Sequence, residues 1–344
     1  MEWVNLLCAA RCRPIHPSIH PSIVRRSVGP SVCLFIYLFI YFLLFIYLCI
    51  YLFIHLGTKP SQRLETASPT QGPSKKDTIG PPEVSVTLLK NKNLPSKATD
   101  WHKVQLPIDF LLLTVKDCEY LSCLSYLNEG FFKSYHKSLG YLYFGDIGDG
   151  ETMTSKIAVI KCNTGSTVPK GSVLVVTKAV KILRPKAVFC VGFCGGLNYR
   201  KVKLGDVVVS ARLTTYAPIK ITDSGVRERG VHVPIPTQLA DLIRSAGEGW
   251  EAPLKDPGQL EVKVHRDGEF LSGPEVVDSK ERRDQLINRF PDAIAIEMEG
   301  EGRTSNNLYY NIPLYWTKSR LSYVQFFYLR YVSYSLLFPS LPNT

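Results

Sequence analysis

From Val104 onward, short apolar runs alternate with amphipathic stretches. The runs are apolar throughout, as in strands that are buried on both faces of a sheet. The stretches between them place apolar residues at helical spacing, and two of them end at Pro185 and Pro291. The pattern therefore predicts an α/β fold, a three-layer sandwich whose central mixed sheet is flanked by helices. The expected strands are Phe110–Thr114, Ile157–Lys161, Ala187–Val191, Val207–Ser210, Gly268–Leu271 and Ala293–Glu297, and the expected helices are Glu119–Leu127, Gly171–Leu183, Thr237–Ala246 and Ser279–Phe290.

A different pattern precedes this region. Residues 32–56 carry no charged side chain except for one late histidine, and they are long enough to cross a bilayer as a helix. The segment is too long and too aromatic for the core of a signal peptide, so it predicts a transmembrane helix. Residues 1–31 are of low complexity, and residues 57–103 read as a flexible linker rich in Pro, Ser, Thr and Lys.

This organisation predicts a single-pass membrane protein whose folded domain, residues 104–302, faces the cytosol. Both N-terminal stretches repeat with a period near four residues, as translated simple-sequence DNA does. If that segment is not expressed, the expected location is the cytosol. Residues 303–344 are dense in Tyr, Phe, Leu and Ser and show no strand–helix unit, so we interpret them as an unrelated aromatic-rich tail.

The distribution of charge along the chain argues against a nucleic-acid partner. The formal net charge is +11, but residues 104–302 are neutral and the excess lies in the flanks. A nucleic-acid-binding domain carries its basic patch on the folded unit, so we expect no nucleic-acid partner. The nine cysteines form no CxxC pair and the seven histidines are scattered, so we expect neither a metal nor a cofactor.

Three stretches could carry chemistry. Gly192, Gly195 and Gly196 follow an expected strand, where glycine lets a ligand approach the main chain. Glu299, in AIEMEGEG, could accept hydrogen bonds from sugar hydroxyls, and Glu119 could orient a water. Each has a plainer alternative: a simple turn for the glycines, and solvated carboxylates at helix N-termini for the glutamates.

Taken in order, the motifs resemble those of the nucleoside phosphorylase superfamily, which includes purine and uridine phosphorylases and the methylthioadenosine/adenosylhomocysteine nucleosidases. They are a strand followed by Glu119, a strand followed by GxxGG, LGD, LSGPEVVD and FPDAIAIEMEG. The resemblance covers about residues 106–302 and implies cleavage of an N-glycosidic bond in a nucleoside, with no cofactor except phosphate as a co-substrate in a phosphorylase. It also implies a homo-oligomer.

The resemblance assigns roles residue by residue. Glu119 and Glu299 become the catalytic carboxylates, and Glu119 is the one that positions the attacking water. Met298 and Glu299 become the ribose contacts. The lining of the base and ribose pocket comes from Gly192, Cys194, Gly195 and Gly196.

Two departures from the family pattern matter. Cys190 and Phe193 stand where the phosphorylases have an Arg and a Ser that hold phosphate. The remaining candidates for phosphate are Lys116, Thr164, Gly165 and Ser166, so hydrolysis is favoured over phosphorolysis.

The second departure lies at the C-terminal side. The family continues past EMEG through a helix and a strand that ends in a Ser/Asp pair, whose Asp protonates the purine. Residues 303–344 contain no acidic residue. We therefore expect a domain that lacks its leaving-group acid and a core strand, with weak or no activity. The alternative is a non-catalytic nucleoside-binding or scaffolding module on a membrane tether.

Overall fold

The computed structural model describes residues 82–148, 154–234, 240, 243–245, 247–300 and 325–333, the last range as backbone only. Residues 32–56 lie outside this part, so the predicted transmembrane helix is not among the described elements. Within the described ranges, no helix is long and apolar enough to cross a membrane.

The domain is an α/β fold around a mixed eleven-stranded sheet, as the hydrophobic pattern predicts. Its order is β1-β3-β4-β5-β2-β6-β12-β11-β7-β10, and β13 pairs with both β6 and β7. The strands are β1 (Ala98–Thr99), β2 (Phe110–Thr114), β3 (Phe132–His136), β4 (Gly140–Gly148), β5 (Thr154–Lys161), β6 (Ala187–Gly196), β7 (Val207–Thr215), β10 (His232–Pro234), β11 (Val264–Ser272), β12 (Ala293–Glu297) and β13 (Gln325–Ser333).

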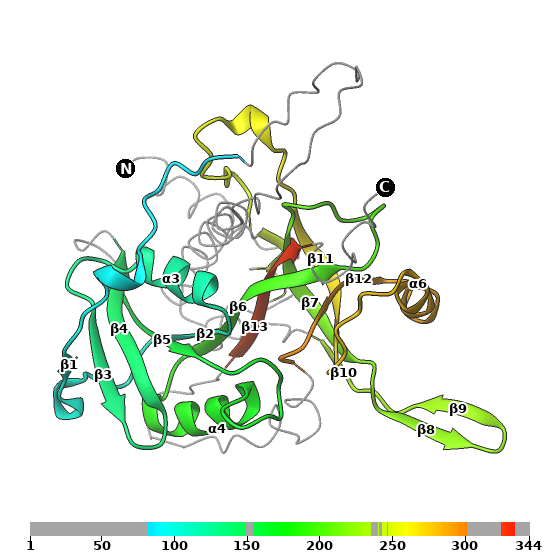
Figure 1. Cartoon of the computed structure of the whole chain (residues 1–344), viewed down its shortest axis with the longest axis horizontal. Helices are drawn as coiled ribbons and strands as arrows, with labels where there is room; N and C mark the ends of the chain where they lie inside the picture. Colours follow the sequence, from blue (N-terminus) through cyan, green and yellow to red (C-terminus); the bar gives the residue numbers. More distant parts are fainter. Residues whose placement is uncertain are drawn as a thin grey trace, which may run out of the picture.

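Helices cover both faces of this sheet (Figure 1). Helix α3 packs in a core cluster with alternate residues of β2 and β6, and α4 packs in a second cluster with the intervening residues. Helix α6 packs outside β11 and β12 on a third cluster around Tyr216 and Phe290. The helices are α3 (Asp117–Ser125), α4 (Ser172–Leu183) and α6 (Lys280–Arg289), with 3₁₀ turns at Asn91–Asn93, Trp101–Lys103 and Pro257–Gln259.

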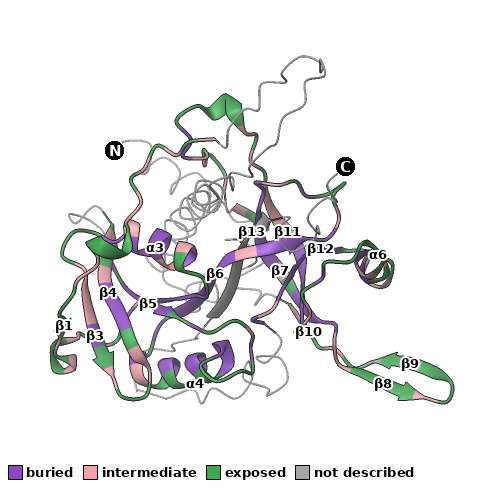
Figure 2. Cartoon of the chain, viewed as in Figure 1, coloured by how far each residue is buried: buried purple, intermediate pink, exposed green. Residues whose placement is uncertain are grey.

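Burial follows the predicted strands closely (Figure 2). All five residues of β2 and all five of β12 are buried, and both strands have the predicted bounds. The predicted helix Thr237–Ala246 falls largely on residues outside the described part. A separate hairpin, β8 (Ile219–Thr222) with β9 (Gly225–Glu228), projects from the body (Figure 1).

Two predictions about the strands need correction. The run Ala187–Val191 does not turn at its glycines, because β6 continues through Gly196 and pairs there with β12. The tail also supplies a strand, since β13 lies parallel to β6 along its whole length. The expectation that the sheet lacks a strand at this place is therefore wrong. The strand ends at Ser333, and the next residue in the sequence is Tyr334.

Asp206, in the LGD motif, anchors the start of β7 through hydrogen bonds. Its buried carboxylate accepts hydrogen bonds from the backbone N–H groups of Lys203 (2.8 Å) and Lys263 (3.1 Å), and it lies 2.8 Å from Nε2 of His265. Burial alone would raise the pKa of Asp206, but these hydrogen bonds and the charge of His265 outweigh it and lower the pKa.

This lowered pKa gives a pH-dependent contribution to stability. Because the folded pKa lies below the ordinary value of 3.8, the contribution is present above that pH and is lost as the pH falls through the folded pKa. We expect Asp206→Asn to lower the urea midpoint at pH 7 and to differ progressively less from the wild type below pH 3.8. A difference that stays constant between pH 7 and pH 3 would contradict this.

Candidate active site

The candidate site lies beyond the carboxyl ends of the parallel strands β2 and β5, where open α/β sheets bind ligands. There the carboxyl end of β6 overlaps that of the antiparallel strand β12. The register places Gly195 of β6 opposite Ile296 of β12. The EMEG sequence therefore begins beside the glycines, although about one hundred residues separate the two motifs. This brings together two of the stretches predicted to carry chemistry, the glycines and EMEG.

Glu299 is held in place by its backbone as well as by its side chain. Its N–H donates to Oε2 of Glu297 (2.9 Å), and its carbonyl accepts from Oγ of Ser172 (2.5 Å). One of its carboxylate oxygens, Oε1, accepts from the N–H of Gly165 (3.3 Å). Glu299 thus ties the end of β12 to the loop after β5 and to the first residue of α4.

The glycine of EMEG is required by close packing. A Cβ at Gly300 would lie 2.7 Å from Oε1 of Glu297 and 2.9 Å from Oγ of Ser272. Its N–H donates to the same Glu297 oxygen at 3.0 Å. Glu297 and Glu299 are only 3% and 5% exposed, so the alternative of two solvated carboxylates is wrong. A carboxylate at this place is suited to stabilising a developing cation.

Glu119 lies in the first turn of α3 and is 1% exposed, so it is not a surface glutamate either. Its Oε2 accepts from the N–H groups of Val115 (2.7 Å) and Lys116 (2.9 Å), and its Oε1 accepts from the N–H of Phe193 (3.1 Å). The carboxylate therefore joins the loop after β2 to β6 at the glycine stretch. Most of its acceptor positions are occupied by these bonds.

This bracing role predicts a loss of stability in Glu119→Gln. A carboxamide has one acceptor oxygen and would turn an NH₂ group toward at least one backbone N–H. Because a buried donor without an acceptor costs about 1–3 kcal/mol, we expect the free energy of unfolding to fall by about that amount. Chemical denaturation measures it, and an unchanged unfolding midpoint would contradict the bracing role.

The predicted pocket residues of β6 are all placed within the strand. Gly192, Gly195 and Gly196 are buried strand positions, and Cys194 is fully buried in the cluster that packs against α4. Met298 is partly buried beside Glu299. Cys118, next to Glu119, is not activated, because burial, with Glu119 adding to it, raises the pKa of its thiol to about 11.

The candidates for phosphate gather at the same edge, but their arrangement is unfavourable for an anion. The N–H of Gly165 already faces the Glu299 carboxylate, and Ser166 is 5% exposed. Thr164 and Lys116 are exposed. A phosphate at this loop would compete with Glu299 for the N–H of Gly165.

Residues that the sequence analysis did not single out complete the site. Ser172 anchors the Glu299 carbonyl, and Glu297 caps the N–H groups of Glu299 and Gly300. Ser172 is the first residue of α4, and its hydroxyl donates to Glu299 rather than capping its own helix, so no local signal in the sequence indicates this role.

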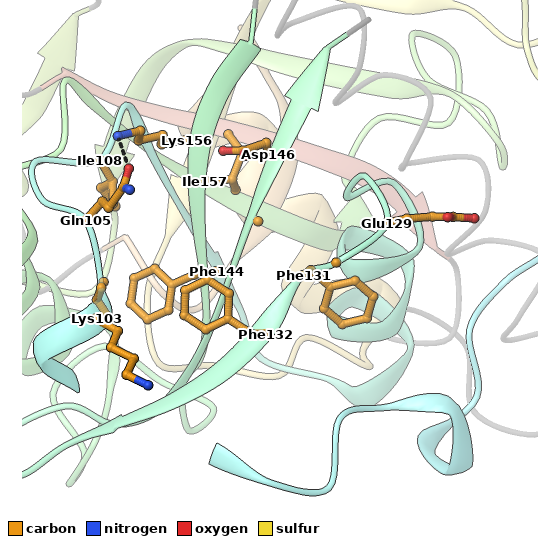
Figure 3. A pocket seen from close by; sticks show the side chains of 13 residues that line it. Lys103, Gln105, Ile108, Glu129, Phe131, Phe132, Phe144, Asp146, Lys156 and Ile157 are labelled. Carbon is orange, nitrogen blue, oxygen red and sulfur yellow. Dashed lines mark hydrogen bonds between the residues drawn. The ribbon is translucent and has the colours of Figure 1, made fainter. Parts of the chain in front are cut away.

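A shallow groove of about 250 Å³ lies at the opposite end of the strands, near the amino ends of β2 and β5 (Figure 3). Its floor includes Phe132 and Phe144, whose stacked rings lie 5.7 Å apart, and Lys156 and Asp146 lie on its rim. None of the predicted site residues lines it. The groove is therefore separate from the candidate active site.

The comparisons with known proteins identify similar sequences and structures. The sequence model of the phosphorylase superfamily matches residues 132–301, a range that includes the glycines and EMEG but not Glu119. A protein of the sponge Amphimedon queenslandica, "Death domain-containing ATP nucleosidase", is 26% identical over 68% of this chain and 47% of its own length. A 5'-methylthioadenosine/S-adenosylhomocysteine nucleosidase of Desulfotalea psychrophila is 23% identical over 48% of this chain and 65% of its own.

The chain thus spans about half the length of the sponge relative and under two thirds of the bacterial one. Among solved structures, a 5'-methylthioadenosine/S-adenosylhomocysteine nucleosidase of Helicobacter pylori is similar, with 19% identity, a TM-score of 0.48, and coverage of 67% of this chain and 86% of that one. A futalosine hydrolase of the same organism has 19% identity, a TM-score of 0.47, and coverage of 66% and 84%. The family match and the order of the motifs show that this chain carries a nucleoside phosphorylase/nucleosidase-type domain of the phosphorylase superfamily.

Proposed function

We propose that the domain cleaves the N-glycosidic bond of a purine nucleoside or nucleotide, and that water rather than phosphate is the acceptor. The observation that carries the proposal is the buried side chain of Glu299. Its carboxylate accepts from the N–H of Gly165, and its main chain is held by Ser172 and Glu297. Two relatives named as an ATP nucleosidase and a methylthioadenosine/adenosylhomocysteine nucleosidase support a purine substrate.

The reaction requires the site to stabilise positive charge on the ribose and to move protons from the water and to the base. As the bond between C1' and the base nitrogen breaks, positive charge develops on the ribose, and Glu299 stabilises it. A water adds its oxygen to C1' and gives up a proton, and the base nitrogen must gain a proton as it leaves. Glu119 is our proposed partner for the water.

The leaving base lacks a carboxyl group that could donate a proton to it, because residues 303–344 contain no carboxyl side chain. We therefore propose that this chain is a slow enzyme.

The test is release of free base by the full chain in mild detergent. The chain is incubated with ATP, adenosine, methylthioadenosine, inosine or uridine, with and without phosphate, and the products are separated by chromatography. Hydrolysis predicts free base and free sugar at a rate that phosphate does not change. A sugar 1-phosphate product would contradict the choice of water, and release from uridine alone would contradict a purine substrate.

A non-catalytic nucleoside-binding module is the second candidate. The observation that favours it is Glu119, whose carboxylate is engaged by three backbone N–H groups. Glu299→Ala separates the two candidates, since an enzyme loses turnover whereas a binding module loses only affinity. Absence of any base release, together with saturable nucleoside binding, would establish the module.

We also propose that residues 32–56 anchor the chain in a membrane with the domain in the cytosol, and that the domain is a homo-oligomer. The first rests on the uncharged sequence and the second on the family resemblance. Alkaline extraction of membranes tests the anchor: the chain remains in the pellet if the segment spans the bilayer and appears in the supernatant if it does not.

A further inference from the structure

Two halves of the sheet meet at β6 and β7. One half is β1-β3-β4-β5-β2-β6 and the other is β12-β11-β7-β10. Among the described strands, the direct pairing between these halves is limited to Gly195 with Ile296 and Gly196 with Ala295. Along the rest of β6, the side facing β7 is filled by β13, drawn in red between them (Figure 1).

The strand β13 pairs with both neighbours. It runs parallel to β6, from Gln325 beside Ala187 to Ser333 beside Gly195. It runs antiparallel to β7, where Leu329 and Tyr331 lie opposite Val209 and Val207. Position 329 is therefore paired on both sides, with Val191 of β6 as its other partner.

The neighbours of β13 are buried strands that need a pairing partner. Residues 187–192 of β6 and 207–209 of β7 are buried. Buried backbone N–H and C=O groups cost free energy when they have no partner, so a gap between these strands favours any extended segment that can complete both ladders. The segment QFFYLRYVS suits this position, because it is rich in aromatic and aliphatic residues and contains neither proline nor glycine.

The connection to β13 is long. Residues 301–324 separate β13 from the last residues of the candidate site, and Gln325 lies beside a strand that begins at Ala187, 138 positions earlier. The loop-closure cost of such a connection grows only slowly with its length, and pairing with β6 and β7 is what places the strand among the described residues.

We propose that the gap between β6 and β7 is a strand-acceptor site whose occupant is the segment 325–333, and that this segment binds there even when it is supplied as a separate peptide. Recognition is β-augmentation, in which main-chain hydrogen bonds provide most of the affinity. Occupancy also controls the candidate active site. Ser333 lies beside Gly195, and the other neighbour of Gly195 is Ile296, which directly precedes Glu297.

Leu329→Pro in the full chain tests the proposal. Proline lacks the N–H that a doubly paired strand needs, so this variant empties the acceptor site. We expect a lower unfolding temperature and faster amide exchange in β6 and β7. A fluorescent peptide of residues 325–333 then binds the variant saturably and restores slow exchange, whereas the same peptide carrying the Leu329→Pro change does not. Leu314→Pro, in the tail but outside the strand, is the matched control and leaves β6 protected.

Two results would overturn the proposal: a folded Leu329→Pro variant that does not bind the peptide, or one whose β6 amides exchange as slowly as those of the wild type. If the variant does not fold, Val332→Cys in the full chain decides. Position 332 lies beside Cys194, which is in no disulfide, so diamide oxidation should link the two within one monomer. Tyr331→Cys, one position away, is the control and should link far less. Equal linking by both variants, or none, would also overturn the proposal.

Discussion

Glu299→Gln is expected to lower the rate of base release by about 100- to 1,000-fold, the range seen when one preorganised electrostatic contact to a transition state is removed. The substitution keeps the size of the side chain and its acceptor for Gly165, but it removes the negative charge that faces the ribose. Because the charge acts on a cation that exists only in the transition state, the loss falls on kcat more than on KM.

The measurement is steady-state release of free purine by the wild type and the variant. Glu129→Gln is the matched control, because this glutamate is exposed and lies in the loop before β3, beside the groove at the other end of the sheet (Figure 3). The control should retain the wild-type rate. Equal rates in all three proteins would show that Glu299 takes no part in the reaction.

Tyr334→Asp is expected to raise the rate of base release, by up to about 10²–10⁴-fold, the contribution typical of a general acid. The family resemblance implies a Ser/Asp pair at the end of the last strand. Here that strand ends at Ser333, which lies beside Gly195, and Tyr334 follows it in the sequence. A carboxyl group at position 334 would supply the leaving base with its missing proton donor.

Ser335→Asp is the control for this experiment, because it adds the same charge one residue further along. A rate increase confined to Tyr334→Asp, with a pH profile that falls as the new carboxyl group ionises, agrees with an acid at that position. An equal increase in both variants would reflect charge alone, and no increase in Tyr334→Asp would refute the assignment.

The central strands could be predicted because burial on both faces dictates their composition. Phe110–Thr114 and Ala293–Glu297 have the predicted bounds, since each is an uninterrupted run of buried residues that follows an aspartate, Asp109 or Asp292. The β3–β4 hairpin was not predicted. It mixes polar, aromatic and glycine residues, and Tyr135 and Tyr141 on its outer face are exposed, so it shows no clear period of two.

The glycines and the tail illustrate two further limits. Three glycines suggest a turn, but in the structure they lie within β6, where they pair with β12 and β13. The segment 325–333 reads as a low-complexity aromatic stretch, and only its long-range partners β6 and β7 define it as a strand. Long-range pairing leaves no local signal when flanking turns and helices are not legible.

The candidate site likewise has features that could be predicted from the sequence and features that could not. The sequence indicates that Glu299 and the glycines each lie near the end of a strand, but their proximity follows from the antiparallel pairing of β12 with β6, which the sequence does not reveal. The buried hydrogen bonds of Glu119 to Val115, Lys116 and Phe193 could not be predicted, because they depend on how α3 turns its first residues back onto β6.

The proposed function depends most directly on whether the site at Glu299 binds a nucleoside. The decisive measurement is thermal unfolding of the full chain in mild detergent, with and without adenosine, methylthioadenosine, ATP or uridine. A purine ligand at 100 times its dissociation constant should add about 2.7 kcal/mol to the stability of the wild type, and much less to that of Glu299→Ala. A cooperative transition that no purine ligand shifts, or that shifts equally in both proteins, would contradict a nucleoside site at Glu299.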